Sequence, residues 1–130
     1  MPDDLGWQEW VNYAEENYQA AAELLETRGL TAVLLLHQAV EKYLKAVLIK
    51  NAMLPDRSHD LVMLLRLIEP SLEFEDELWK AARELNYLLP RARYPSGGQK
   101  PSPQALRNAF NYATVLRALA LSKLEENNSD

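Results

Sequence analysis

Hydrophobic residues recur along the chain at the spacing of amphipathic helices, in five segments separated by short polar turns. In the longest segment, residues 32–52, apolar side chains cover about half or more of a helical circumference drawn at roughly 100° per residue. The remaining arc is apolar at both ends and polar only in its two central turns, at His37, Gln38, Glu41, Lys42 and Lys45. A stripe that only faced water would be polar along its whole length. We therefore expect neighbouring elements to cover the ends of this stripe.

Two interpretations of this polar patch stay open. Glu41 and Lys45 are four residues apart in the favourable order, and His37 and Glu41 have the same spacing, so a solvated, salt-paired face explains the patch. Alternatively, a compact polar patch between apolar turns forms the floor of a pocket or a seam between two subunits.

Capping residues, glycine and prolines set the expected helix boundaries. The expected N-caps, in chain order, are Asp3 or Asp4, Thr31, Ser58, Ser71 and Ser102. The expected stops of the first four helices are Gly29, Pro55 after Ala52, Pro70 and Pro90. His59 is expected in the first turn of the short third helix. The sequence therefore predicts an all-α fold, an up-and-down bundle of four long helices plus one short helix, in a single domain over residues 1–130.

The segment from Arg91 to Pro101 is expected to be the only sustained non-helical stretch. It is the most basic part of the chain, because it contains Arg91, Arg93 and Lys100, together with Tyr94 and the pair Gly97-Gly98. A flexible backbone and forked guanidinium groups suit the binding of phosphate or carboxylate. An ordinary surface loop, with Arg93 paired to one of many carboxylates, is the alternative.

Composition excludes several classes of function. The formal net charge is −5, which argues against a dedicated nucleic-acid binder, and RNA is not favoured as a partner. There is no cysteine and there are only two histidines, so we expect no disulfide, no cysteine nucleophile and no metal site. No apolar run reaches the length of a membrane span, and the acidic N-terminus does not resemble a signal peptide. We therefore expect a cytoplasmic protein without a membrane partner.

Three segments carry characteristic combinations of residues in a fixed order. They are the central sequence from His37 to Ala46, the tetrapeptide Ser58-His59-Asp60-Leu61, and Tyr87 followed by Arg93-Tyr94-Pro95. Together they resemble the HEPN family, small prokaryotic α-helical proteins named for a proposed nucleotide-binding role. The family motifs read His/Gln-Gln-Ala-x-Glu-Lys-x-x-Lys-Ala, then Thr/Ser-His-Asp-Leu, then Tyr followed by Arg-Tyr-Pro. With the helix order, the resemblance covers nearly the whole chain.

The resemblance implies a helical bundle, commonly a homodimer, that is frequently paired genetically with a small nucleotidyltransferase, either in the manner of a toxin and its antitoxin or as a nucleotide-handling accessory. It also implies a link to metal-independent ribonucleases, which use an Arg-x(4–6)-His motif late in the domain. This sequence departs from that motif. Arg28 is too far before His37, and Arg57 is too near His59. The departure argues against ribonuclease activity, and we assign no catalytic residue.

We therefore expect a non-catalytic nucleotide-binding module that acts with a small nucleotidyltransferase and takes ATP or another nucleotide. Lysines and arginines would contact phosphates, Tyr94 would stack on a base, and His37 and Glu41 would orient these groups. The candidate binding residues are His37, Glu41, Lys42, Lys45, His59, Arg91, Arg93 and Tyr94. One alternative is a ribonuclease toxin with a rearranged active site built from His59 and Arg93. The other is a purely structural dimeric domain whose polar patch is the subunit seam.

Overall fold

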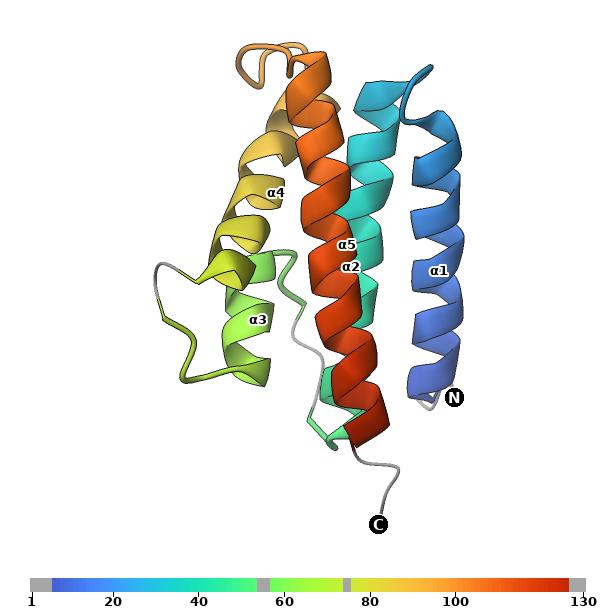
Figure 1. Ribbon diagram of the computed structural model, residues 1–130, viewed down its shortest axis with the longest axis vertical. Coiled ribbons are helices and arrows are strands. Elements are labelled where there is room, and N and C mark those ends of the chain that lie inside the picture. Colours follow the sequence, from blue (N-terminus) through green and yellow to red (C-terminus); the bar gives the residue numbers. More distant parts are fainter. Residues whose placement is uncertain (1–5, 54–56, 74–75, 127–130) are drawn as a thin grey trace.

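The computed structural model of this protein describes residues 6–53, 57–73 and 76–126. These residues form five α-helices and no strand (Figure 1). The helices are α1 (Trp7–Leu24), α2 (Gly29–Lys50), α3 (Leu61–Ile68), α4 (Glu77–Arg93) and α5 (Pro103–Glu126). The predicted all-α bundle of four long helices plus one short helix is confirmed.

The central helix of the bundle is α2, which packs against all four other helices. Twelve of its 22 residues are buried, including Leu36, Val40, Leu44 and Leu48. Leucine and alanine side chains from the other helices complete one continuous core around it. Burial of this apolar surface is the dominant stabilising contribution, and it fixes the faces that α2 turns to its neighbours.

Successive long helices run in opposite directions along the bundle axis (Figure 1). The turn between α1 and α2 and the loop between α4 and α5 lie at the same end of the molecule (Figure 1). The short helix α3 lies below α4 in Figure 1 and packs against both α2 and α4. None of the described helices combines the length and apolar character needed to cross a bilayer.

The boundaries of α2 differ from the expected ones. The helix begins at Gly29 rather than after Thr31, and its N-cap is Arg28. Gly29 does not end α1, which stops at Leu24. Instead Gly29 is the first residue of α2, where a Cβ would clash with Leu106 of α5. At the other end α2 stops at Lys50, two residues before the expected limit. Ala52 adopts a φ of 59°, which turns the chain out of the helix. The proposed cap at Asp3 or Asp4 and the stop at Pro55 lie outside the described residues.

The expected caps of α3 and α4 were wrong by a few residues. Asp60, not Ser58, caps α3, because its carboxylate accepts hydrogen bonds from the backbone amides of Val62 and Met63. His59 therefore precedes α3 instead of lying in its first turn. Similarly, Asp76 rather than Ser71 caps α4. The expected cap of α5 is confirmed, since Ser102 Oγ accepts a hydrogen bond from the Ala105 amide at 3.1 Å.

Pro90 does not end α4. The helix continues for almost one more turn to Arg93, and the Tyr94 amide donates to the Pro90 carbonyl at 3.0 Å. A proline removes only the hydrogen bond that its own missing N–H would make, and so close to a helix end few bonds are affected. As a result Arg91 and Arg93 belong to a helix and not to the following loop, which begins at Tyr94.

Candidate functional site

The polar patch of α2 divides between two sides of the helix. Lys42 faces α1, where its Nζ donates to Asn17 Oδ1 at 2.6 Å and lies 5.9 Å from the centre of the Tyr13 ring. His37, Glu41 and Lys45 lie on the side toward the start of α3. His37 is 2% exposed and Lys45 is 7% exposed. The interpretation as a solvated face therefore does not hold for these two residues, which neighbouring elements cover.

Glu41 accepts hydrogen bonds from two cationic or ionisable groups. Lys45 Nζ donates to its carboxylate at 2.8 Å, and His59 Nδ1 lies 2.9 and 3.0 Å from its two oxygens. Burial alone would raise the pKa of Glu41, but the hydrogen bonds and charges of Lys45 and His59 outweigh it and lower the pKa below its ordinary value. Glu41 is therefore a carboxylate at neutral pH. Since a carboxylate only accepts, His59 Nδ1 carries a hydrogen.

Asn86 of α4 connects three segments of the chain through its side-chain amide. Its Nδ2 donates to Asp60 Oδ1 at 2.8 Å, so its Oδ1 is the atom that faces the other two partners. Oδ1 accepts from the Leu61 amide at 3.2 Å and lies 3.1 Å from His37 Nε2. Because an amide oxygen is only an acceptor, His37 Nε2 must carry the hydrogen. The same side chain thus fixes the tautomer of His37 and holds the cap of α3.

The environment of His37 favours the neutral imidazole. Burial lowers its pKa, and the positive charges of Arg93 and His59 lower it further. The hydrogen bond to Asn86 and the charge of Glu41 act in the opposite direction but do not outweigh burial. His37 Nδ1 lies 4.0 Å from Glu41, beyond hydrogen-bond distance. His37 is therefore held beside Asn86 in an environment that disfavours its positive charge.

Sequence reasoning missed Asn86. The residue follows Leu85 and comes one turn after Ala82, both of which are buried. An amide on the apolar face of a helix requires a hydrogen-bonding partner, and that requirement was the available signal. A second missed cluster joins Glu15, Tyr43 and Arg117: Arg117 Nε donates to Glu15 at 2.6 Å and to the Tyr43 hydroxyl at 3.0 Å. It ties α1, α2 and α5 together and lies apart from the His37 side of α2.

Residues from α2, the loop before α3 and the end of α4 enclose a pocket of about 250 Å³, which we call the histidine pocket. Its lining residues are His37, Gln38, Glu41, Lys42, His59, Leu89 and Arg93. The His59 side chain is 77% exposed at its rim. Pockets for drug-sized ligands measure about 300–1,000 Å³, so this one suits a phosphate group or one ring better than a whole nucleotide.

A second pocket of about 430 Å³ lies where α4 passes into the loop toward α5, and we call it the arginine pocket. Its lining residues are Leu30, Arg91, Ala92, Arg93, Tyr94, Pro95, Gly98 and Lys100. The loop thus lies beside the beginning of α2 at Leu30, and from the segment 91–101 only Arg93 reaches the histidine pocket. Arg93 belongs to both pockets.

The structure brings five of the eight candidate residues together in the histidine pocket, namely His37, Glu41, Lys42, His59 and Arg93. Arg91 and Tyr94 line the arginine pocket, and Lys45 lies beneath, bonded to Glu41. Within the described ranges, no three His, Cys, Asp or Glu side chains are grouped closely enough to hold a metal ion. Chemically, the arrangement offers cationic and N–H donors to an anion.

Comparisons with known proteins agree with this architecture. The HEPN domain model matches residues 7–124. The fold is similar to the crystal structure of TT1696 from Thermus thermophilus, with a TM-score of 0.78 and 20% sequence identity over 90% of this chain and 97% of that chain. At this identity the likeness concerns the fold alone. No curated protein sequence matches the chain. Since the family model spans α1 to α5, the chain belongs to the HEPN domain family.

Proposed function

We propose that this protein is a non-catalytic nucleotide-binding module that acts with a small nucleotidyltransferase, as one half of a toxin–antitoxin pair. The observation that supports it most is the position of Arg93. Its guanidinium lines the histidine pocket, and no carboxylate among the described residues forms an ion pair with it. An arginine that is left without an anionic partner in a pocket is suited to hold a phosphate.

The remaining pocket residues have separate roles in this proposal. Arg93 donates to the phosphate. Lys42, whose Nζ donates to Asn17, adds positive charge at the pocket wall, and the exposed His59 lies at the rim. Lys45 does not reach the ligand, because its ammonium group is buried against Glu41, whose charge it balances. The excess positive charge of the pocket therefore comes from Lys42 and Arg93. Tyr94, which is 54% exposed, is available to stack on a base.

Titration calorimetry with AMP and ATP tests nucleotide binding. Arg93→Gln is expected to weaken binding by about 10- to 100-fold, because one charge-assisted hydrogen-bonding group contributes about 1.5–3 kcal/mol. Arg83→Gln is the matched control, since Arg83 is an exposed arginine of the same helix outside both pockets. No binding to the wild-type protein at high concentration, or equal weakening by both variants, would contradict the proposal.

The partnership with a nucleotidyltransferase and the homodimer are proposed from family membership. A tagged pull-down from the native host, followed by mass spectrometry and native mass measurement, tests both. We expect a stoichiometric nucleotidyltransferase and a mass of two copies of this chain. A Lys45 seam is disfavoured as the basis of the dimer, because Lys45 already pairs with Glu41 of its own chain.

One observation favours ribonuclease activity as a second candidate. Glu41 orients His59 through Nδ1 and leaves Nε2 at the pocket rim, where Arg93 also lies. This is the relation between a general base and the carboxylate that orients it, next to a cation for developing phosphate charge. If His59→Ala cleaves RNA as fast as the wild-type protein, this assignment is wrong.

A further inference from the structure

The arginine pocket gathers positive charge without a counter-charge. Three of its eight lining residues are cations, Arg91, Arg93 and Lys100, and none is acidic. Among the residues described by the structure, no carboxylate forms an ion pair with any of these three. The chain carries 19 acidic and 14 basic residues, so carboxylates are not scarce. Because neighbouring like charges repel one another, a pocket of this kind is stabilised by a bound anion.

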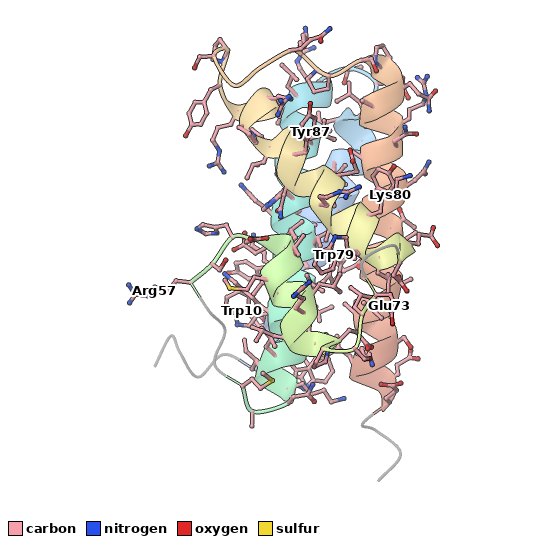
Figure 2. The ribbon with its side chains drawn as sticks, turned by 90° about the vertical axis from the view of Figure 1, so that its left-hand side faces the viewer. Trp10, Arg57, Glu73, Trp79, Lys80 and Tyr87 are labelled. Carbon is pink, nitrogen blue, oxygen red and sulfur yellow. The ribbon has the colours of Figure 1, made fainter. Side chains whose placement is uncertain are left out.

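The local backbone holds Arg91 in place. Its guanidinium donates to the Tyr87 carbonyl at 2.9 Å and lies 3.7 Å from the centre of the Tyr87 ring. Figure 2 labels Tyr87 on α4. Gly98, with a φ of 116°, packs so closely that a Cβ would lie 3.0 Å from Arg91 Nε. A Cβ at Gly97 would clash with the Pro90 carbonyl. The two glycines thus let the loop close onto the end of α4, and a side chain fixed in advance loses less entropy when it binds.

We propose that the arginine pocket is a second phosphate subsite, so that the ligand of this domain carries a chain of at least two phosphates, as a nucleoside di- or triphosphate does. Arg93 lines both pockets, so one guanidinium can contact a phosphate in the histidine pocket and its neighbour in the arginine pocket. Arg91 and Lys100 bind the remaining phosphates. A nucleoside monophosphate, with a charge of about −2, leaves these two cations without an anion. The inference rests on the proposed nucleotide binding.

The test compares the affinities of AMP, ADP, ATP and inorganic tripolyphosphate by titration calorimetry. We expect ATP to bind at least about tenfold tighter than AMP, since additional charge-assisted hydrogen bonds form. Lys100→Gln and Arg91→Gln should each weaken ATP and tripolyphosphate by about tenfold and leave AMP within twofold. Lys80→Gln on the exposed side of α4, outside both pockets, is the control and should change none of the four affinities (Figure 2).

The outcomes separate this inference from the proposed function. Equal affinity for AMP and ATP, or ATP binding that is unchanged in both Lys100→Gln and Arg91→Gln, would overturn the second subsite while nucleotide binding stands. Tripolyphosphate binding that depends on Lys100, without binding of any nucleotide, would support the subsite and remove the nucleotide function. If none of the four ligands binds, both proposals are wrong. Because Arg91 also contacts Tyr87, circular dichroism and the melting temperature of Arg91→Gln must match those of the wild-type protein, and Lys100→Gln decides if they do not.

Discussion

The side chain of Asn86 is expected to stabilise the folded protein through its hydrogen bonds to two buried donors and to the cap of α3. Asn86→Ala removes three hydrogen bonds, those with His37, with the Leu61 amide and with Asp60. His37 is 2% exposed and Leu61 is fully buried, so two donors lose their acceptor where water has little access. An unsatisfied buried donor costs about 1–3 kcal/mol. Because the nearby histidine pocket admits some water, we expect a loss of about 2–4 kcal/mol in the free energy of unfolding.

Urea denaturation followed by circular dichroism measures this loss. For an m-value of about 2 kcal/mol/M, the midpoint should fall by about 1–2 M while m stays unchanged. Asn108→Ala is the control, because Asn108 accepts one hydrogen bond, from Gln104 on the exposed side of α5, and should change stability by about 0.5 kcal/mol or less. Equal midpoints for the two variants would refute the reasoning.

Asn86→Asp examines the orientation of the amide. The aspartate keeps an acceptor for His37 and for Leu61 but replaces the donor to Asp60 with a second carboxylate, 2.8 Å away in the present geometry. We expect it to be destabilising at neutral pH, because two neighbouring carboxylates repel each other. A variant as stable as the wild-type protein would mean that Nδ2 does not face Asp60.

Three further predictions concern other parts of the bundle. Burial holds the pKa of His37 below its ordinary value of about 6.5, so the unfolded chain takes up a proton first as the pH falls. The stability due to neutral His37 is therefore complete above about pH 6.5 and is lost as the pH falls toward the folded-state pKa. Between pH 7 and 5, the urea midpoint of His37→Gln should fall less than that of the wild-type protein. Ala52→Gly should raise the free energy of unfolding by about 1 kcal/mol in urea denaturation, because glycine adopts the φ of 59° at the end of α2 without strain; an unchanged midpoint would contradict this. Tyr43→Phe should lower the free energy of unfolding by about 1 kcal/mol in urea denaturation, because it removes the hydroxyl that bonds Glu15 and Arg117 but leaves those two paired at 2.6 Å. A loss above about 3 kcal/mol would mean that the ion pair depends on the hydroxyl.

Local signals in the sequence determined the number and type of the helices but not all their ends. The apolar stripe of α2 and the Ser102-Pro103 start of α5 depend on nearest neighbours along the chain, and both were predicted. The caps of α3 and α4 were not, because each segment offers more than one residue able to cap. By sequence alone, Ser58 and Asp60 are equally able to cap α3. In the structure Asp60 is the cap, and its carboxylate also accepts a hydrogen bond from the Asn86 side chain of α4. Tertiary contacts override local preference at such ends.

The candidate site was predictable to a similar degree. The spacing of His37, Glu41 and Lys45 indicated one helix face, but only the packing of α3 and α4 determines that His37 and Lys45 are buried. The basic segment was recognised, yet Pro90 suggested a loop where the helix in fact continues. Lys42 of α2 and Arg93 of α4 are far apart in sequence, yet both line one pocket. Contacts between residues so far apart along the chain leave no periodic pattern to read.

The Leu61 amide is held by a side chain and not by a helix carbonyl, and this gives the protein an internal reporter. The first amides of a helix have no partner within it, so Leu61 is protected from hydrogen exchange only while Asn86 stays in place. Amides deeper in α2 exchange when the bundle itself opens. The difference between these two exchange rates therefore measures how often the polar network beside the histidine pocket opens while the fold remains intact.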